Sequence, residues 1–191
     1  MKPKVEAMLT DPLSLSSERV APVHVSLEAI YDEHFDTVYR WARSLGGPRV
    51  DPEDVAQDVF LVVQRRLHDF DGQNVAGWLY AITQRVVARH RRNVWWRRLV
   101  FGRADVQRDE IVDDAADSGR RLEQKRASER FHRVVARMNA RWRDTFVLFE
   151  VVGYTGDELA SLTGLPHATV RTHLRRARQQ FVALLAEEGE R

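Results

Sequence analysis

Residues 155–181, TGDELASLTGLPHATVRTHLRRARQQF, determine how the rest of the chain is interpreted. Thr155 and Glu158 have the spacing of a capping box, which begins a helix. Gly164 can adopt the left-handed backbone of a sharp turn, and Pro166 suits the first turn of a following helix. That second helix has one apolar face, formed by Val170, Leu174, Ala177 and Phe181. The stretch therefore predicts two short helices joined by a tight turn.

The opposite side of the second helix is polar and basic. It carries Ala168, Arg171, Thr172, Arg175 and Arg176. A helix that is buried on one side, basic on the other and placed after a tight turn is typical of a helix-turn-helix. The alternative is an ordinary solvated surface, where arginine-rich amphipathic helices are also common. The capping box and the turn residues favour the helix-turn-helix.

Charge is segregated along the chain, although the net charge is only +2. Residues 85–103 contain seven arginines and no acid, whereas residues 105–117 contain six acids and one arginine. Local basic segments of this kind favour contact with nucleic acid more than the total charge does. The chain has no cysteine, so disulfides and thiol chemistry are excluded. No apolar run approaches the ~20 residues of a membrane span, and the absence of an apolar signal core leads us to expect a cytoplasmic protein.

The N-terminal half is predicted to contain three helices. Residues 1–25 lack periodicity and are expected to form a disordered tail. Ser26 can cap a helix whose apolar stripe is interpreted as core, and this helix ends at residues 46–48, GGP. Asp51 and Pro52 begin the next helix. It has a buried face and a second face that is polar around Leu61, where a protein could dock. That second face consists of Asp54, Gln57, Asp58, Leu61, Gln64, Arg65 and His68.

A third helix is expected over residues 75–92, with a basic flank near its end. The flank consists of Gln84, Arg85, Arg89, His90, Arg91 and Arg92. Residues 94–126 are interpreted as a flexible linker, because their second part is acidic and poor in helix formers. Trp95 and Trp96 are too apolar for a solvated linker, and we expect them to fold back on the preceding helices. Docking on a partner and contact with a membrane surface are the alternatives for this pair.

The pattern as a whole predicts an all-α protein with two small helical domains, at residues 26–93 and 127–186. No segment alternates with a period of two, so no strand is expected. A phosphate-cradling glycine loop, a metal-spaced histidine pair and an activated nucleophile are all absent from the sequence. We therefore expect no enzyme activity, no cofactor, no metal and no small-molecule substrate. His90, His167 and His173 lie in basic surroundings and are expected to meet phosphates or water.

Three segments together resemble the extracytoplasmic-function (ECF) branch of the bacterial RNA polymerase sigma factors. DPEDVAQDVFLVVQRRLHDF, residues 51–70, is similar to the family's region 2.2. GWLYAITQRVVARHRR, residues 77–92, is similar to its regions 2.3 and 2.4. The segment from residue 141 to residue 181 is similar to region 4. The resemblance implies that the protein binds core polymerase, recognises the minus-ten and minus-thirty-five promoter elements and helps to open the DNA.

The resemblance also implies roles for particular residues. The clamp helices of the largest polymerase subunit would be contacted by Asp54, Gln57, Asp58 and Leu61. The minus-ten element would be contacted by Asn74, Arg85, Arg89, His90 and Arg92. The minus-thirty-five element would be contacted by His167, Thr169, Arg171, Thr172, Arg175, Arg176 and Arg178. The polymerase flap and an anti-sigma factor are the other partners that the resemblance implies.

Two other functions remain open at this point. A helix-turn-helix regulator that acts without core polymerase would bind duplex DNA alone, usually at a symmetric site. An adaptor that binds only proteins would tolerate alanine at its exposed arginines. The promoter, the regulon and the inducing signal are not encoded in any pattern that the sequence presents.

Overall fold

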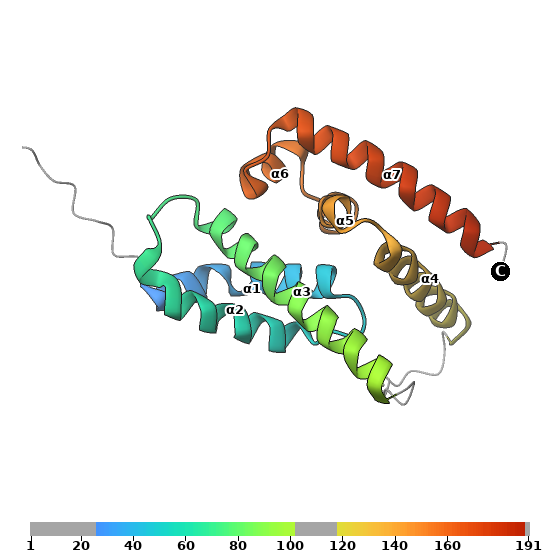
Figure 1. Ribbon diagram of the computed structural model, residues 1–191, viewed down its shortest axis with the longest axis horizontal. Coiled ribbons are helices and arrows are strands. Elements are labelled where there is room, and N and C mark those ends of the chain that lie inside the picture. The colour runs from blue at the N-terminus through green and yellow to red at the C-terminus, as the bar shows by residue number, and fades with distance from the viewer. Residues whose placement is uncertain (1–25, 102–117, 190–191) are drawn as a thin grey trace, which may run out of the picture.

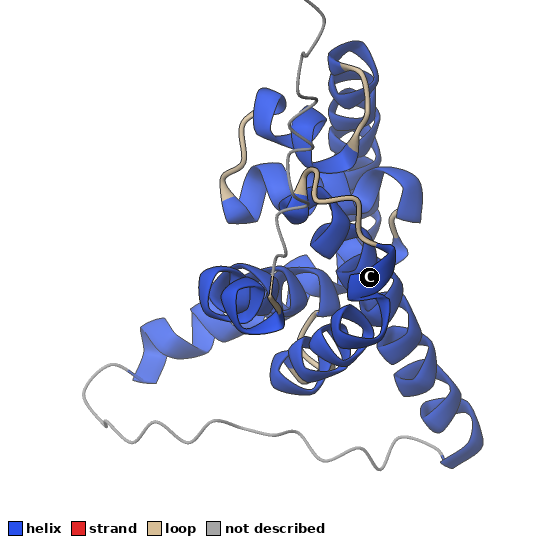
Figure 2. Ribbon diagram, turned by 90° about the vertical axis from the view of Figure 1, so that its left-hand side faces the viewer, coloured by secondary structure: helices blue, strands red, loops and turns tan. Residues whose placement is uncertain are grey.

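The computed structural model of the chain describes residues 26–101 and 118–189, and every regular element in these two ranges is helical (Figures 1 and 2). The predicted all-α fold is therefore confirmed for the described residues. Residues 1–25, which were predicted to be a disordered tail, lie outside them. The elements are α1 (Leu27–Gly46), α2 (Pro52–Arg66), the short η1 (Leu67–Asp69), α3 (Val75–Phe101), α4 (Ser118–Arg137), α5 (Ala140–Val147), η3 (Leu148–Val152), α6 (Gly156–Thr163) and α7 (His167–Gly189).

Helices α1, α2 and α3 pack together as the N-terminal helical unit. The Ser26 hydroxyl accepts a hydrogen bond from the amide of Ala29 at 3.1 Å and caps α1. The Asp51 carboxylate accepts from the amide of Glu53 at 2.9 Å and caps α2, with Pro52 in its first turn. Both predicted helix starts are confirmed. The apolar faces meet in a core that contains Ile30, Val38, Trp41, Val55, Val59, Val63, Leu79, Val86 and Val87.

Helix α3 runs to Phe101, nine residues beyond the expected end at residue 92. The interpretation of residues 94–126 as a flexible linker was therefore wrong at both ends, because α4 also begins at Ser118 rather than near residue 122. No glycine or proline interrupts residues 78–101, and the arginines near the end of α3 favour its C-terminal dipole. The remainder of the expected linker, residues 102–117, lies outside the described residues.

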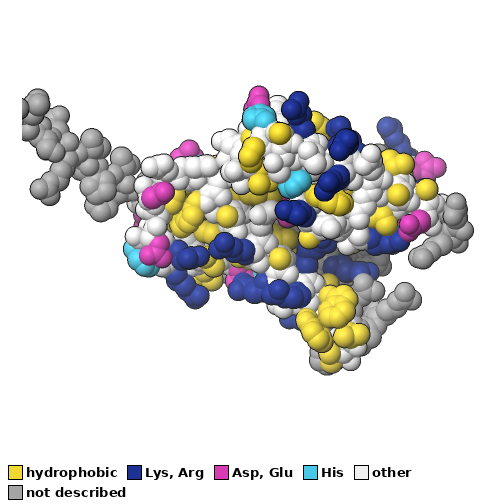
Figure 3. Space-filling view, turned by 45° about the horizontal axis from the view of Figure 1, so that its top comes forward, with side chains coloured by type: hydrophobic (Ala, Val, Ile, Leu, Met, Phe, Trp, Pro, Cys, Tyr) yellow, Lys and Arg dark blue, Asp and Glu magenta, His cyan; other side chains and the backbone are white. Residues whose placement is uncertain are grey.

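Trp95 and Trp96 do not fold back on the core, which corrects the expectation from their hydrophobicity. They are 56% and 53% exposed and touch each other edge to face, with ring centroids 5.1 Å apart. The extension of α3 carries them past the start of α2, away from the other helices of the N-terminal unit (Figure 1). Figure 3 shows hydrophobic side chains gathered at one tip of the molecule.

Helices α4 to α7 form the C-terminal helical unit. Its core contains Val134, Phe146, Val147, Leu148, Leu159, Val170 and Leu174. Phe181 closes this core from α7, with its ring centroid 5.0 Å from Phe146 and 5.8 Å from Phe131. Helix α5 continues into a π-helical turn, η3, which ends where Gly153 takes a positive φ of 89°. The change of direction at Gly153 places α6 and α7 after a sharp bend.

The two helical units lie against each other in the described structure. α6 lies against α3, and η3 lies against α1. The buried side chains of both units belong to one hydrophobic cluster. Two units that are separate in sequence therefore share a continuous apolar interior.

Gly164 provides a test of the turn between α6 and α7. It ends α6 with a φ of 68°, and a Cβ added there would meet no atom within 4 Å. Gly164→Ala should therefore cost about 1–2 kcal/mol of unfolding free energy through the left-handed backbone alone. Chemical denaturation of the full chain measures this value.

Gly156 is the matched control for that substitution. It also has no atom within 4 Å of an added Cβ, but it begins α6 without a positive φ. Gly156→Ala should leave the stability unchanged or raise it by about 0.4–1 kcal/mol, because alanine restricts the unfolded chain. An equal loss for both variants would contradict the backbone explanation.

Candidate nucleic-acid interface

The predicted helix-turn-helix is present as α6, a turn at Gly164, and α7. The amide of Thr155 donates to the Glu158 carboxylate at 2.7 Å, and the amide of Glu158 donates to the Thr155 hydroxyl at 3.2 Å. This reciprocal capping box is the one expected from the sequence, and its hydrogen bonds lower the pKa of Glu158. Val170, Leu174 and Ala177 are buried under α7, so the opposite face of the helix is presented to solvent.

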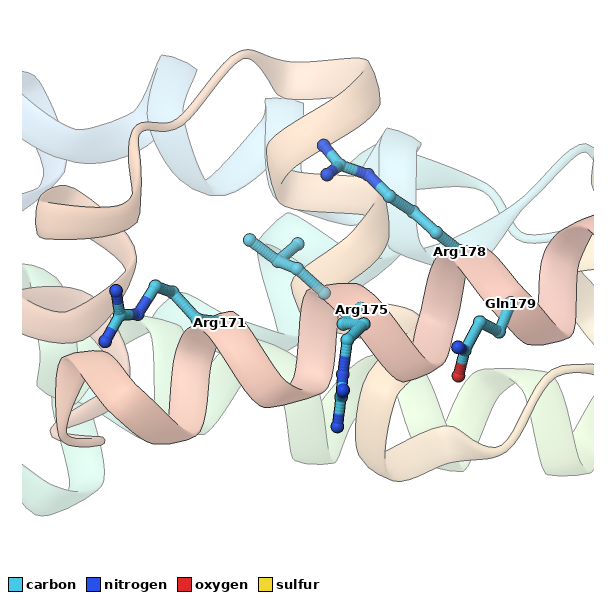
Figure 4. Close-up of a pocket in the computed structure, with 5 residues that line it drawn as sticks. Arg171, Arg175, Arg178 and Gln179 are labelled. Atoms are coloured by element: carbon cyan, nitrogen blue, oxygen red, sulfur yellow. The ribbon is translucent and has the colours of Figure 1, made fainter.

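Arg171 and Arg175 are the best-presented cations on α7. Both are exposed, and neither makes an ion pair with another residue in the described ranges. They line a shallow depression with Leu174, Arg178 and Gln179. In Figure 4, Arg175 and Gln179 point to one side of the helix and Arg178 to the other. Free guanidinium groups on an exposed helix are suited to guanine edges and phosphates.

Other predicted residues of α7 are already engaged. Arg178 donates to the Glu150 carboxylate at 2.8 Å and lies 5.2 Å from the centre of the Phe149 ring. The guanidinium of Arg176 lies 5.7 Å from the centre of the Trp142 ring. These contacts hold both side chains toward α5 and η3. Thr169 and Thr172 are half-buried, and the Thr172 hydroxyl donates to the carbonyl of Ala168 at 2.8 Å.

Histidines at the start of α7 behave differently from one another. His167 is exposed, with its Nε2 3.0 Å from a carboxylate oxygen of Asp157. His173 is only 8% exposed, which contradicts the expectation that it meets phosphates or water. Its Nδ1 has no hydrogen-bond partner among the described residues. Burial, together with the nearby charges of Arg141 and Arg176, lowers the pKa of His173 and favours its neutral form.

The polar face of α2 borders a groove between α1 and α2. Asp54, Gln57 and Leu61 line this groove, and Leu61 is 42% exposed. Aromatic side chains of α1, namely Tyr31, Phe35 and Tyr39, form the other wall. The apolar stripe of α1 was expected to form core, but Tyr31, which lies on this stripe, is 44% exposed.

Asp58 does not belong to that groove. Its Oδ2 lies 2.6 Å from the Nη2 of Arg89 and 2.7 Å from the Nε2 of His90, both on α3. Partial burial raises the pKa of Asp58, but the hydrogen bonds and charges of His90 and Arg89 outweigh it and lower the pKa overall. The predicted polymerase-binding set is thereby divided, since Asp58 is joined to two residues predicted to contact DNA.

Asn74 stands at the start of α3 in a left-handed conformation, with a φ of 43°. Its side-chain oxygen accepts from the amide of Gly77 at 2.9 Å, and its side-chain nitrogen donates to the carbonyl of Ser161 in α6 at 3.0 Å. Arg85 and Arg92 are exposed along α3. The residues predicted for the minus-ten element thus lie along one helix, and Figure 3 shows basic side chains spread over both units on the face in view.

Comparisons with known proteins agree with this geometry. Residues 30–97 match the family model described as Sigma-70 region 2, and residues 128–181 match the one described as Sigma-70, region 4. The chain is 27% identical over 157 residues to RNA polymerase sigma factor NccH of Alcaligenes xylosoxydans xylosoxydans, covering 82% of this chain and 84% of that protein. It is 30% identical over 158 residues to RNA polymerase sigma factor CnrH of Cupriavidus metallidurans, covering 78% and 81%.

A solved structure of CnrH in complex with the cytosolic domain of CnrY is also similar. It has a TM-score of 0.55 and 26% sequence identity, and the match covers 84% of this chain and 88% of that one. Two helical DNA-binding units on one chain define a bipartite promoter-recognition protein. The chain belongs to the sigma-70 family of RNA polymerase sigma factors, in its ECF branch.

Family membership determines the general function. The protein is a sigma factor for transcription initiation, with RNA polymerase and promoter DNA as its partners, and it acts through region 2 and region 4 without enzyme activity. A regulator that acts without polymerase and a protein-only adaptor are no longer favoured. Within residues 26–101 and 118–189, no helix is long and apolar enough to cross a membrane. Across the same ranges, no group of three His, Asp or Glu side chains is placed to hold a metal.

The contact between Asp58 and Arg89 can be tested by a double-mutant cycle. Asp58→Asn and Arg89→Ala should each lower the denaturation midpoint, and the double variant should lose less than their sum. The coupling should be about 0.2–1 kcal/mol, because the pair is partly solvent-exposed. Gln57→Ala on the same helix should show no coupling to Arg89→Ala. Additive losses for Asp58 and Arg89 would mean that the pair does not form in solution.

Proposed function

We propose that the groove between α1 and α2 is the core-polymerase docking site of this sigma factor, and that the clamp helices of the largest subunit occupy it. The supporting observation is that exposed Tyr31 and Leu61 lie in one groove rimmed by Asp54 and Gln57. Apolar anchors inside a polar rim are characteristic of protein interfaces. Asp58 acts from the neighbouring surface, where it positions Arg89 and His90.

Region 2 of the protein contacts the minus-ten element in this proposal. Asn74 offers an amide at the start of α3, and an amide can pair with the edge of an unstacked base. Arg85, Arg89, His90 and Arg92 hold phosphates of the non-template strand. Region 4 contacts the minus-thirty-five element through α7, with Arg171 and Arg175 at base edges and the other predicted α7 residues around them. The polymerase flap holds region 4 at the upstream element.

An anti-sigma factor is the proposed regulator. The similar solved structure contains CnrH bound to the cytosolic domain of CnrY, which supports a protein inhibitor for this chain as well. Because core polymerase and promoter DNA are cytoplasmic in bacteria, we propose that the protein acts in the cytoplasm. Run-off transcription with core polymerase on a genomic library tests the function directly and identifies the promoter. A chain that never binds core polymerase would contradict the proposal.

Substitution of Leu61 tests the docking groove. Leu61→Asp should weaken binding to core polymerase at least tenfold, about 1.4 kcal/mol or more, because it places a charge at the apolar centre of the interface. Binding is measured by competition against a labelled wild-type chain. Val182→Asp is the matched control, since Val182 is 65% exposed on α7 and should tolerate the charge. Equal effects of the two substitutions would contradict the assignment of the groove.

Substitution of the free arginines tests α7. With holoenzyme on the promoter identified above, Arg171→Ala or Arg175→Ala should each cost about 1–3 kcal/mol of promoter affinity if it loses a bidentate guanine contact. Arg126→Ala, an exposed arginine of α4, should change the affinity little. Full affinity in both α7 variants would show that the helix does not read the upstream element through these residues.

A further inference from the structure

The last two turns of α3 carry an apolar surface that no other described helix covers. Its four side chains are all more than half exposed, namely Trp95 (56%), Trp96 (53%), Leu99 (62%) and Val100 (65%). This surface, called the α3 tip below, takes part in neither the docking groove nor the α7 face. Apolar side chains that gather in one exposed patch mark a binding surface, whereas single ones need no explanation.

The α3 tip continues a basic stripe that runs along the same side of the helix. Spacings of four, three, four and three residues place five side chains on one face: Arg85, Arg89, Arg92, Trp96 and Leu99. Arg85 and Arg92 are exposed and make no ion pair within the described ranges. Val94 packs against the core from the other side. One exposed face of α3 therefore changes from cationic to aromatic toward its C-terminal end.

The charge around the α3 tip suits a polyanion. Residues 85–103 contain seven arginines and no acid, and Arg97 is exposed next to the indoles. An anionic membrane surface has the same charge, but it would have to meet the face of α3 that is proposed to hold promoter phosphates. Arg92 lies about one turn before Trp96 on that face. Continuity with the proposed minus-ten surface therefore favours DNA as the partner.

The position of the α3 tip indicates which DNA it meets. From Asn74 to Trp96 the helix rises about 33 Å, which is close to one turn of B-DNA. The chain leaves the α3 tip at Phe101 and continues to region 4, which is proposed to hold the upstream element. The α3 tip therefore lies at the upstream end of region 2, where the promoter is still paired when Asn74 holds an unstacked base.

The two indoles are suited to contact a duplex from its minor groove. They meet edge to face with ring centroids 5.1 Å apart, so together they present a blunt apolar edge. Apolar side chains that enter the minor groove act as wedges, which unstack a base step and kink the duplex. Arg92 precedes the pair and Arg97 follows it, and guanidinium groups on both sides can bind the adjoining phosphates.

We propose that the α3 tip is a second DNA contact of region 2, in which Trp95 and Trp96 form an apolar wedge in the minor groove of the duplex that borders the minus-ten element upstream. Arg92 and Arg97 hold the phosphates on the two sides of the wedge. This assignment rests on the proposed function of region 2, because the wedge reaches DNA only if the basic stripe of α3 lies along the minus-ten element.

The wedge gives the promoter a preference that does not depend on reading a base edge. Pyrimidine–purine steps such as TA and CA unstack most easily, so such a step beneath Trp95 and Trp96 costs the least to deform. Unstacking one step beside the minus-ten element also brings the duplex closer to the open state. The wedge therefore acts on the rate of promoter opening.

Fluorescence of 2-aminopurine tests the wedge, because this adenine analogue brightens when it is unstacked. It is placed at one position at a time in the upstream duplex of the promoter that run-off transcription identifies. Wild-type holoenzyme should brighten the analogue at one step. Trp95→Ala combined with Trp96→Ala should abolish this signal and slow open-complex formation by about tenfold or more.

Three other variants serve as controls. Trp95→Phe combined with Trp96→Phe keeps two aromatic rings and should retain both the signal and the opening rate. Arg97→Ala should retain the signal but reduce the salt dependence of promoter binding, by about one in the slope. Val182→Ala removes an apolar side chain of α7 that is 65% exposed, and it should change neither readout. Circular dichroism checks that every variant is folded.

The outcomes distinguish the wedge from other uses of the α3 tip. An undiminished signal and opening rate in the alanine double variant would overturn the proposal, while leaving the sigma-factor function intact. Binding to core polymerase alone, binding to vesicles of phosphatidylglycerol and phosphatidylcholine, and the denaturation midpoint of the free chain are measured for the same variant. A loss in one of these with an unchanged 2-aminopurine signal would assign the α3 tip to polymerase, to membrane or to packing within the chain, and would also overturn the proposal. Failure of wild-type holoenzyme to open any promoter would instead contradict the proposed function.

Discussion

The burial of Trp41 is the interaction on which the arrangement of this molecule most depends. The side chain is 1% exposed, and its ring meets Tyr80 of α3 edge to face with centroids 5.4 Å apart. A buried indole usually finds a hydrogen-bond acceptor, and for Trp41 the Tyr154 hydroxyl of the other unit provides it. One side chain therefore helps to complete the core of region 2 and joins it to region 4. The hydrogen bond of Trp41 is thus one of the contacts that hold the two promoter-binding units together.

The positions of individual charged side chains matter more in this protein than its net charge does. Asp58 binds Arg89 and His90 within region 2, and Glu150 holds Arg178 on region 4. Each acid removes or restrains a cation that the sequence alone presents as available to DNA. Arg171 and Arg175 remain without such partners in the described ranges, which is why the proposed base contacts are placed there.

Much of the fold could be predicted because its signals are local. Asp51 and Pro52 begin α2, Thr155 and Glu158 cap α6, and Gly164 turns the chain, each through contacts within a few residues. The apolar faces of α3 and α7 follow from helical period. We expected α3 to end at residue 92, because the composition of the residues that follow is typical of a linker. The helix continues to Phe101, because no glycine or proline interrupts it. Trp95 and Trp96 were expected to be buried, but they are exposed. Hydrophobic side chains become buried only where a neighbouring surface lies within reach, and the residue type alone does not indicate whether one does.

By itself, the sequence determined that the chain is helical, that it carries a helix-turn-helix, and that its motifs resemble two sigma-factor regions in order. Only the tertiary structure decided which of the motif residues are available. His173 and Asp58 carry the residue types expected at a DNA or protein surface, but one is buried and the other is paired across helices. Exposure and pairing depend on neighbours that are distant in the chain, as Asn74 and Ser161 show. Local pattern cannot specify such contacts, because they form only when whole helices pack.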